Sequence, residues 1–150
     1  MLNTLIPDQY YSRPTYSGIP LAQKLGIKKR DTIMVVNRPE NYYKLLTELP
    51  QCVTFTKNAD IKKEIIHYFC LDIEALKETI GELINQIQEN GMIWISWPKK
   101  ASGTQTNVSE NGIRDIALHS GLVDVKVCSV DTEWSALKVV KRIKDRKQEK

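Results

Sequence analysis

The sequence predicts an α/β fold built on a mostly parallel sheet of about six strands. Short, continuously apolar runs such as Thr32–Val36 and Ile65–Leu71 are typical of strands that are buried on both faces of a sheet. Helical segments separate these runs, as crossovers between parallel strands require. Alternating residues in the last part of the chain predict a closing antiparallel hairpin.

The first half of the chain opens with an irregular arm, residues 1–16. A short helix follows, in which Pro20 occupies the first turn and Gly26 ends the helix. After strand Thr32–Val36, the turn at 37–40 starts a second helix that carries Leu45, Leu46 and Leu49 and that Pro50 stops. The second strand is expected at Cys52–Thr56.

The second half alternates strands and helices more clearly. A polar link over Lys57–Glu64 leads to strand Ile65–Leu71, and Asp72 is a good N-cap for the longest helix. That helix is expected to bury a stripe from Leu76 to Ile87 and to stop at Asn90-Gly91. The remaining expected elements are a strand at Met92–Trp97, a loop at Pro98–Val108, a helix from Ser109 to Gly121, and strands around Val123–Val127 and Trp134–Ile143.

This element order resembles a class I methyltransferase fold that lacks one strand–helix unit. The resemblance implies the spatial strand order 2-1-3-4-6-5, with strand six antiparallel. The link from strand two to strand three has about eight residues, which is too short for a full crossover helix. We therefore predict a three-layer Rossmann-like sandwich over residues 17–143, followed by a charged tail at 144–150.

Composition sets limits on the function. The chain has 150 residues, a length that fits one domain, and a net charge of +4. The last ten residues, KRIKDRKQEK, account for that whole charge, so the body of the protein is neutral. Binding to nucleic acid needs a clustered basic face, and the sequence shows only a basic tail. We therefore do not expect a nucleic-acid partner.

The sequence also indicates a cytoplasmic protein. Its first residues lack the pattern of a signal peptide, and no apolar stretch approaches the ~18–20 residues of a membrane span. Cys52, Cys70 and Cys128 are odd in number and lack CxxC spacing, which predicts buried free thiols in a reducing compartment. His67 and His119 have no metal-ligand spacing, so we expect no metal site.

The turn after the first strand lacks the residues of a nucleotide cofactor site. Dinucleotide and S-adenosylmethionine sites favour glycines there, because the ligand approaches the backbone closely. Here the turn reads VVNRPENYYK, and Asn37 and Arg38 place side chains in that space. The turn is either purely structural or a site where Asn37 or Arg38 binds an anion at a helix N-terminus. The sequence identifies no cofactor.

The strand-exit segment WISWPKKASG is the best candidate for a binding site. It places Trp97 beside the cations Lys99 and Lys100, and Ser102 adds a hydroxyl donor. Lysine ammonium groups suit phosphate or carboxylate ligands. The alternative is a rigid turn with a buried tryptophan and solvated lysines. In an open α/β sheet this segment, Asn37 and the end of strand three converge where the strand order reverses.

Other candidate catalytic groups have structural interpretations. His67 alternates with Ile65 and Phe69 and is expected to be a hydrogen-bonded core histidine. Asp131 and Glu133 are explained by a polar hairpin turn. Neither a GxSxG motif nor a plausible cysteine–histidine pair is present, so no catalytic residue is assigned.

Three segments resemble a bacterial family catalogued as a domain of unknown function: SGIPLAQKLGI, ISWPKKASG and GLVDVKVCSVDTEWSALKVVKR. The resemblance spans about residues 15–143. It implies a single bacterial, cytoplasmic domain and supplies no catalytic residues. The chain departs from the family at KKRD, residues 28–31, where a Pro-Gly turn is more usual.

Three functions remain open. The leading hypothesis is a non-catalytic domain that binds a small anion through Asn37, Arg38, Trp97, Lys99, Lys100 and Ser102. The second is a diverged methyltransferase-like enzyme. The third is an interaction module that forms a homodimer through the N-terminal arm or the hairpin edge.

Overall fold

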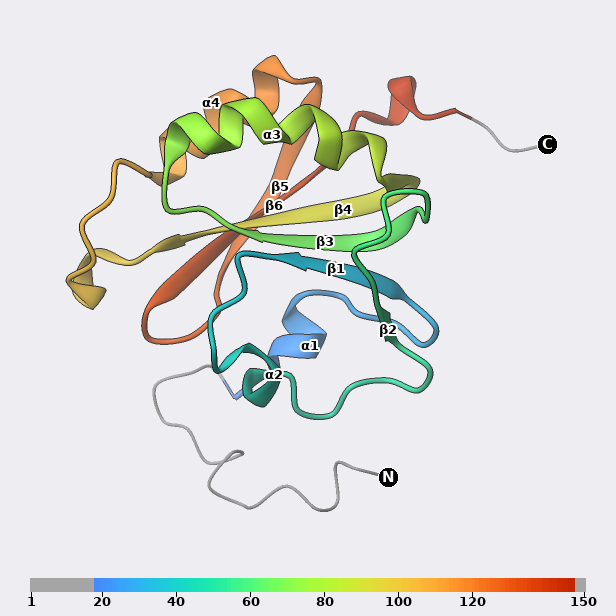
Figure 1. The fold of residues 1–150 in the computed structure, drawn as a ribbon, viewed down its shortest axis with the longest axis horizontal. Helices are drawn as coiled ribbons and strands as arrows, with labels where there is room; N and C mark the ends of the chain where they lie inside the picture. Colours follow the sequence, from blue (N-terminus) through green and yellow to red (C-terminus); the bar gives the residue numbers. More distant parts are fainter. Residues whose placement is uncertain (1–17, 148–150) are drawn as a thin grey trace.

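A computed structural model describes residues 18–147 as a three-layer α/β sandwich (Figure 1). Its sheet has six strands in the order β2-β1-β3-β4-β6-β5. The predicted fold class and strand order are confirmed. The strands are β1 (Thr32–Val36), β2 (Thr54–Phe55), β3 (Lys63–Phe69), β4 (Ile87–Pro98), β5 (Leu122–Ser129) and β6 (Trp134–Lys141). The α-helices are α1 (Leu21–Lys24), α2 (Tyr42–Leu45), α3 (Ile73–Asn85) and α4 (Glu110–His119).

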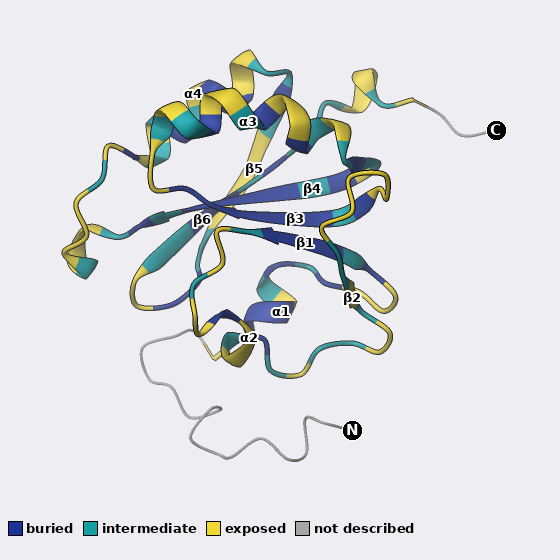
Figure 2. Cartoon of the chain, in the orientation of Figure 1, coloured by how far each residue is buried: buried dark blue, intermediate teal, exposed yellow. Residues whose placement is uncertain are grey.

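Strands β2, β1, β3 and β4 are parallel, and β6 pairs antiparallel with both β4 and β5. The chain passes from β2 to β3 without a helix, as the short link predicts. Helices α3 and α4 cover one face of the sheet, and the short helices α1 and α2 lie on the opposite face (Figure 1). Figure 2 shows that β3 and the inner part of β4 are buried between these layers, whereas much of edge strand β5 is exposed.

Two apolar clusters hold the layers together. The larger lies under α3 and α4 and includes Ile66, Leu76, Ile93 and Ile113, all fully buried. The smaller lies under α1 and α2 and includes Leu25, Phe69 and Trp94, whose indole Nε1 donates to the Leu25 carbonyl over 3.0 Å. Each cluster draws on one face of the alternating strand residues, as expected for a sheet that is covered on both sides.

A chain of polar side chains crosses the smaller cluster. His67 is completely buried, its Nδ1 lies 2.9 Å from the Tyr42 hydroxyl, and its Nε2 lies 2.7 Å from Ser96 Oγ. Both ring nitrogens therefore have a hydroxyl partner, and His67 is the satisfied core histidine that the sequence predicts. Burial lowers the pKa of His67 from 6.5 to about 3, so its imidazole is neutral at neutral pH.

The longest helix ends earlier than its apolar stripe predicts. Helix α3 stops at Asn85, and Ile87 begins β4 instead of completing the helix. Gly91 is consequently a strand residue, where β3 and β4 shift register between Lys63 and Ile65. A Cβ atom on Gly91 would lie 3.1 Å from the carbonyl oxygens of Lys63, Glu64 and Gln88. The glycine permits a close backbone approach and is not a helix stop, which corrects the prediction.

Three further boundaries differ from the prediction. Strand β2 has only two residues, and α2 ends at Leu45 because the following backbone turns and Glu48 adopts a left-handed φ of 60° before Pro50. Strand β3 begins at Lys63, inside the segment expected as a polar link. Lys63 is fully buried, and its ammonium donates to the Asn58 carbonyl over 2.7 Å and to Gln86 Oε1 over 2.6 Å. Two neutral acceptors let the strand bury this cation.

The cysteine prediction is only partly correct. Cys70 is buried, whereas Cys128 is half-buried and Cys52 is exposed. Cys52 precedes the shortened β2 in a turn with a left-handed φ of 62°, so no neighbouring element covers it. The expected arm at 1–16 lies outside the described residues. At the other end, the Lys147 amide donates to Glu89 Oε1 over 2.9 Å, so part of the basic tail contacts the sheet.

Candidate functional site

The turns after β1, β3 and β4 meet at one edge of the sheet, because these strands are parallel neighbours. Asn37 leaves β1 with a left-handed φ of 58°, a conformation that asparagine tolerates better than most residues. Its Nδ2 donates to the Phe69 carbonyl at the end of β3 over 3.1 Å. Asn37 therefore ties the ends of β1 and β3 together at the point where the strand order reverses.

The next two predicted residues have partners of their own. The Arg38 guanidinium lies 4.8 Å from the centre of the Tyr43 ring, a cation–π contact at the surface of α2. Trp97 is half-buried and packs against the larger apolar cluster, under α3 and α4. The position of Trp97 agrees with the alternative in which the segment is a rigid turn and the tryptophan packs in the core. Neither side chain joins Asn37 in a common group.

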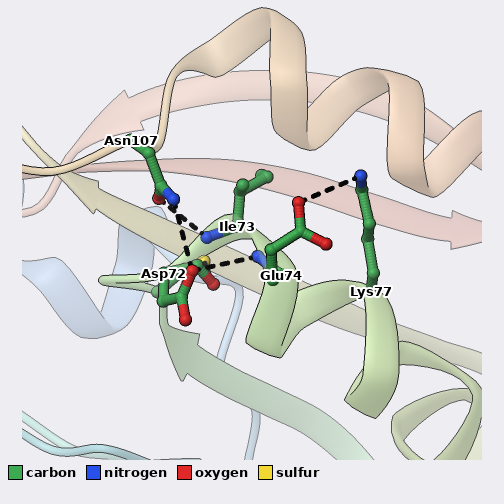
Figure 3. A network of polar contacts seen from close by, with 6 residues as sticks. Asp72, Ile73, Glu74, Lys77 and Asn107 are labelled. Atoms are coloured by element: carbon green, nitrogen blue, oxygen red, sulfur yellow. Dashed lines mark hydrogen bonds and ion pairs between the residues drawn. The ribbon is translucent and has the colours of Figure 1, made fainter.

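Lys100 lines an open hollow of about 750 Å³ beside the N-terminus of α3. Two backbone amides in the first turn of α3 already have hydrogen-bond acceptors (Figure 3). Asp72 Oδ1 accepts from the Glu74 amide over 3.1 Å, and Asn107 Oδ1 accepts from the Ile73 amide over 2.9 Å. The predicted N-cap role of Asp72 is thereby confirmed. The Asp72 carboxylate also lines the hollow and opposes an anion next to Lys100. The other lining residues are Leu71 and the run 103–107.

Lys99 points to a different part of the molecule. Its ammonium donates to Ser129 Oγ over 2.7 Å, and its backbone amide donates to the Glu133 carbonyl over 2.8 Å. Ser102 Oγ donates to the Lys99 carbonyl over 2.7 Å, so this pair of predicted residues is brought together. The Lys24 ammonium donates to the Ser129 carbonyl over 3.1 Å. Two cations from distant segments therefore meet at the end of β5.

Two more lysines lie further along the hairpin, on the face of the sheet opposite to the Ser129 side chain. Lys126 of β5 lies directly opposite Lys138 of β6, and Cys128 lies opposite Ala136 on the same sheet face. Alternation along β6 puts Lys138 on the face of Ala136, which belongs to the apolar cluster under α1 and α2. We call Lys24, Lys28, Lys99, Lys126 and Lys138 the lysine cluster.

Members of the lysine cluster affect the pKa values of their neighbours. Burial lowers the pKa of Lys138, and the positive charges of Lys126 and Lys28 lower it further. Burial raises the pKa of the Cys128 thiol, while Lys24, Lys126 and Lys99 act in the opposite direction. The half-buried thiol thus sits among three cations, and Lys138 is linked electrostatically to Lys28.

Carboxylates do not neutralise the central members of this cluster. The ion pairs of the described residues join Lys77 to Glu74, Arg114 to Glu110 and Asp124, and Lys141 to Glu89. Within residues 18–147, Lys99, Lys126 and Lys138 form no ion pair. The neighbouring Asp131 carboxylate accepts from the Glu133 and Trp134 amides over 2.8 and 2.9 Å, which confirms its structural role in the hairpin turn.

Sequence reasoning found Lys99 and missed the rest of the cluster. The alternation of Lys126 with Val125 and Val127 indicates which residues share a face of the hairpin. The pairing with Lys138 depends on an irregularity between Asp124 and Lys126 that shifts the register. No sequence signal marks that shift or brings Lys24 of α1 to Ser129.

Other classes of site are not evident in the part of the chain that the structure describes. No group of three or more histidine, cysteine or acidic side chains there is arranged to hold a metal ion. Among the same residues, no helix has the length and apolarity needed to cross a membrane.

Several solved structures with a similar fold are described as methyltransferases. A SAM-dependent methyltransferase from Aquifex aeolicus has a TM-score of 0.57 at 13% identity, with 89% of this chain and 93% of that chain covered. A putative type 11 methyltransferase from Sulfolobus solfataricus has a TM-score of 0.56 at 14% identity, covering 85% and 93%. An S-adenosylmethionine-dependent methyltransferase from Clostridium acetobutylicum has a TM-score of 0.55 at 9% identity, covering 94% of both chains. At these identities the likeness shows the fold alone.

The turn after β1 lacks the glycines with which Rossmann-like folds usually bind a nucleotide cofactor such as S-adenosylmethionine. The turn after β1 has no glycine, and the Asn37 side chain crosses from β1 to the Phe69 carbonyl of β3. The Asn37 side chain therefore bridges the two strand ends at the turn where such sites favour glycine.

Sequence comparison gives a family and no activity. No curated protein is similar enough to this chain to count as a relative. The profile of one family matches residues 53–143, which is more than half of the chain and includes β3, β4 and the whole closing hairpin. The chain therefore belongs to the family described as "Protein of unknown function (DUF3052)".

Proposed function

We propose that this protein is a non-catalytic, Rossmann-like domain that binds a small anion at the lysine cluster. The observation that carries the proposal is the meeting of the Lys24 and Lys99 ammonium groups at Ser129. Lys99 was already part of the anion site expected from the sequence, whereas Lys100 faces the hollow beside Asp72. We place the protein in the bacterial cytoplasm, supported by its free cysteines and by the bacterial family that its motifs resemble.

The balance of charge supports an anionic ligand. Like charges directly opposite each other on a sheet are destabilising, and Lys126 faces Lys138 in this way. A bound anion offsets that repulsion and gains charge-assisted hydrogen bonds from the ammonium groups. Phosphate suits such a site, because a lysine ammonium acts as a compact point charge with three donors.

The test is the binding of orthophosphate, measured by calorimetry and by the thermal unfolding midpoint. We expect orthophosphate to raise the midpoint of the native protein in a concentration-dependent manner. Lys99→Gln should abolish that rise. Lys100→Gln, the adjacent charge change beside Asp72, is the matched control and should leave it unchanged. Equal responses of the two variants, or no heat of binding in the native protein, would overturn the proposal.

A methyltransferase-like enzyme is the competing function. Its support is the fold shared with the Aquifex and Clostridium methyltransferases, which their names describe as dependent on S-adenosylmethionine. The glycine-free turn and the Asn37–Phe69 contact argue against it. Calorimetric titration with S-adenosylmethionine separates the two proposals: saturable heat that persists in Lys99→Gln favours the enzyme.

A homodimer remains the third proposal. Its support is edge strand β5, where Val125 and Val127 are 51% and 43% exposed. Exposed apolar residues on a sheet edge favour pairing with another strand, although Lys126 between them opposes it. Light scattering at increasing protein concentration decides this proposal, since a mass that stays at one chain excludes the dimer.

A further inference from the structure

We infer that the open hollow beside the first turn of α3 binds a small zwitterion, of the class of free amino acids and short peptides. The hollow has a volume of about 750 Å³, which is within the usual range of small-molecule sites. It lies beyond the carboxyl ends of β3 and β4, where ligands bind in open α/β sheets. None of the described residues that line it belongs to the lysine cluster, so the inference does not depend on the proposed anion-binding function.

Two opposite charges line the hollow and are not joined by an ion pair. They are the Asp72 carboxylate and the Lys100 ammonium, and the ion pairs within residues 18–147 lie elsewhere. Asp72 Oδ1 accepts from the Glu74 amide and from Asn107 Nδ2, the latter over 3.3 Å. The second Asp72 carboxylate oxygen and the Lys100 ammonium form no hydrogen bond within residues 18–147. One acceptor and one donor of opposite charge are therefore open to a ligand.

This combination of charges decides the class of ligand. A simple anion beside Lys100 meets the Asp72 carboxylate, and a simple cation beside Asp72 meets the ammonium group. A metal ion lacks ligands here, because the described residues contain no group of three or more histidine, cysteine or acidic side chains that could hold one. A zwitterion satisfies both charges, since its ammonium donates to the carboxylate and its carboxylate accepts from the lysine. The flexible stem of the lysine lets its ammonium adjust to the spacing of the two groups.

An exposed leucine adds an apolar contact to the same hollow. Leu71 precedes Asp72 in the chain, lines the hollow with it and is 53% exposed. The apolar side chain of a ligand would cover this surface, and the removal of apolar area from water favours binding. Free amino acids and short peptides combine an ammonium, a carboxylate and an apolar side chain in one small molecule.

Hydrogen bonds within the protein hold the wall of the hollow in place. Thr106 Oγ1 donates to the Leu71 carbonyl over 2.8 Å. Asn107 accepts from the Ile73 amide and donates to Asp72 Oδ1 (Figure 3). These bonds fasten the loop after β4 to the turn after β3. A wall that is already ordered lowers the entropy cost of binding a small ligand.

The experiment is a titration with leucine, followed through the backbone amide resonances of an isotopically labelled sample. We expect saturable shifts at residues 71–72 and 100–107. N-acetyl-leucine lacks the ammonium of leucine, and leucinamide lacks the carboxylate. Each blocked form should bind at least about fivefold more weakly than leucine, because one charged contact is lost. The dipeptide leucyl-leucine distinguishes the two sources: tighter binding than leucine identifies peptides, and weaker binding identifies free amino acids.

Two variants match the two blocked ligands. Lys100→Gln should weaken leucine binding at least about fivefold and remove the advantage of leucine over leucinamide. Asp72→Asn should weaken it by the same factor and remove the advantage over N-acetyl-leucine. Asparagine is also a good N-cap, so this variant keeps the start of α3. Lys77→Gln, on α3 but outside the lining of the hollow, is the matched control and should change leucine binding by less than about twofold.

Several results would overturn the inference. Shifts that do not saturate, or that lie away from the hollow, exclude a site there. Equal binding of leucine and its two blocked forms shows that the charges play no part. Unchanged leucine binding in Lys100→Gln has the same meaning, and this exposed position keeps the test valid if Asp72→Asn fails to fold. Orthophosphate binding at Lys99 is measured separately, so a negative result with leucine leaves the proposed function intact.

Discussion

The buried His67 makes the stability of this protein depend on pH. In the folded state the imidazole lies between the Tyr42 hydroxyl and Ser96 Oγ, and burial lowers its pKa from 6.5 to about 3. Below pH 6.5 the unfolded chain takes up a proton at this residue, whereas the folded chain does not. The contribution of His67 to stability is therefore complete above pH 6.5 and decreases as the pH falls.

The size of the effect follows from the two pKa values. Well below pH 6.5 the free energy of unfolding decreases by about 1.4 kcal/mol per pH unit for one excluded proton. Between pH 7.5 and pH 5 the expected loss is about 2 kcal/mol, which is a large part of the stability of an ordinary domain. Desolvation is the cause, since it is the one effect that moves this pKa.

The assay is urea unfolding at several pH values between 7.5 and 5, for the native protein and for His67→Gln. The variant loses the titrating ring, so its free energy of unfolding should fall with pH by about 2 kcal/mol less than that of the native protein. The exposed His119 is present in both proteins and cancels in the difference. If His67→Gln does not fold, the imidazole resonances of the native protein give the same information. A parallel pH dependence of the two proteins, or a His67 resonance that titrates near pH 6.5, refutes the reasoning.

Two local predictions follow from the described contacts. Gly91→Ala should lower the free energy of unfolding by about 1–3 kcal/mol, because the new Cβ meets three carbonyl oxygens at 3.1 Å, whereas Gly81→Ala, in an open position on α3, should raise it by about 0.5–1 kcal/mol. Equal urea midpoints for these two variants would contradict the close-approach argument. Ser109→Ala should cost about 1 kcal/mol in the same measurement, because Ser109 Oγ accepts from the Gly112 amide over 3.1 Å at the start of α4. Ser109→Asp retains the acceptor and should stay within about 0.5 kcal/mol of the native protein.

Much of the fold could be predicted from the sequence because the relevant signals are local. The apolar run Thr32–Val36 became β1 unchanged, and the caps Asp72 and Ser109 start the helices that they were expected to start. These residues act through their immediate neighbours along the chain. The strand order was implied by the resemblance of the element order to a class I methyltransferase fold, and the structure has that order.

Boundaries failed where a local pattern competed with a distant contact. Ile87 continues the helical period of α3, yet pairing with Lys63 makes it the first residue of β4. Gly91 resembles a helix stop in the sequence, but in the structure it lets the carbonyl oxygens of Lys63 and Glu64 in β3 approach closely. Tertiary pairing overrode the helical period at both positions.

In the candidate site, too, some features follow from local sequence and others depend on distant contacts. The sequence by itself determined that the strand-exit segment carries two lysines and that the first turn lacks the glycines of a nucleotide site. Only the tertiary structure separated Lys99 from Lys100 and brought Lys99 and Lys24, which are distant in the chain, to the same residue, Ser129. It also paired Lys126 with Lys138 through a register shift. Side-chain direction at a strand end and register across a hairpin depend on contacts between segments that are distant in the chain, and such contacts leave no periodic signal in the sequence.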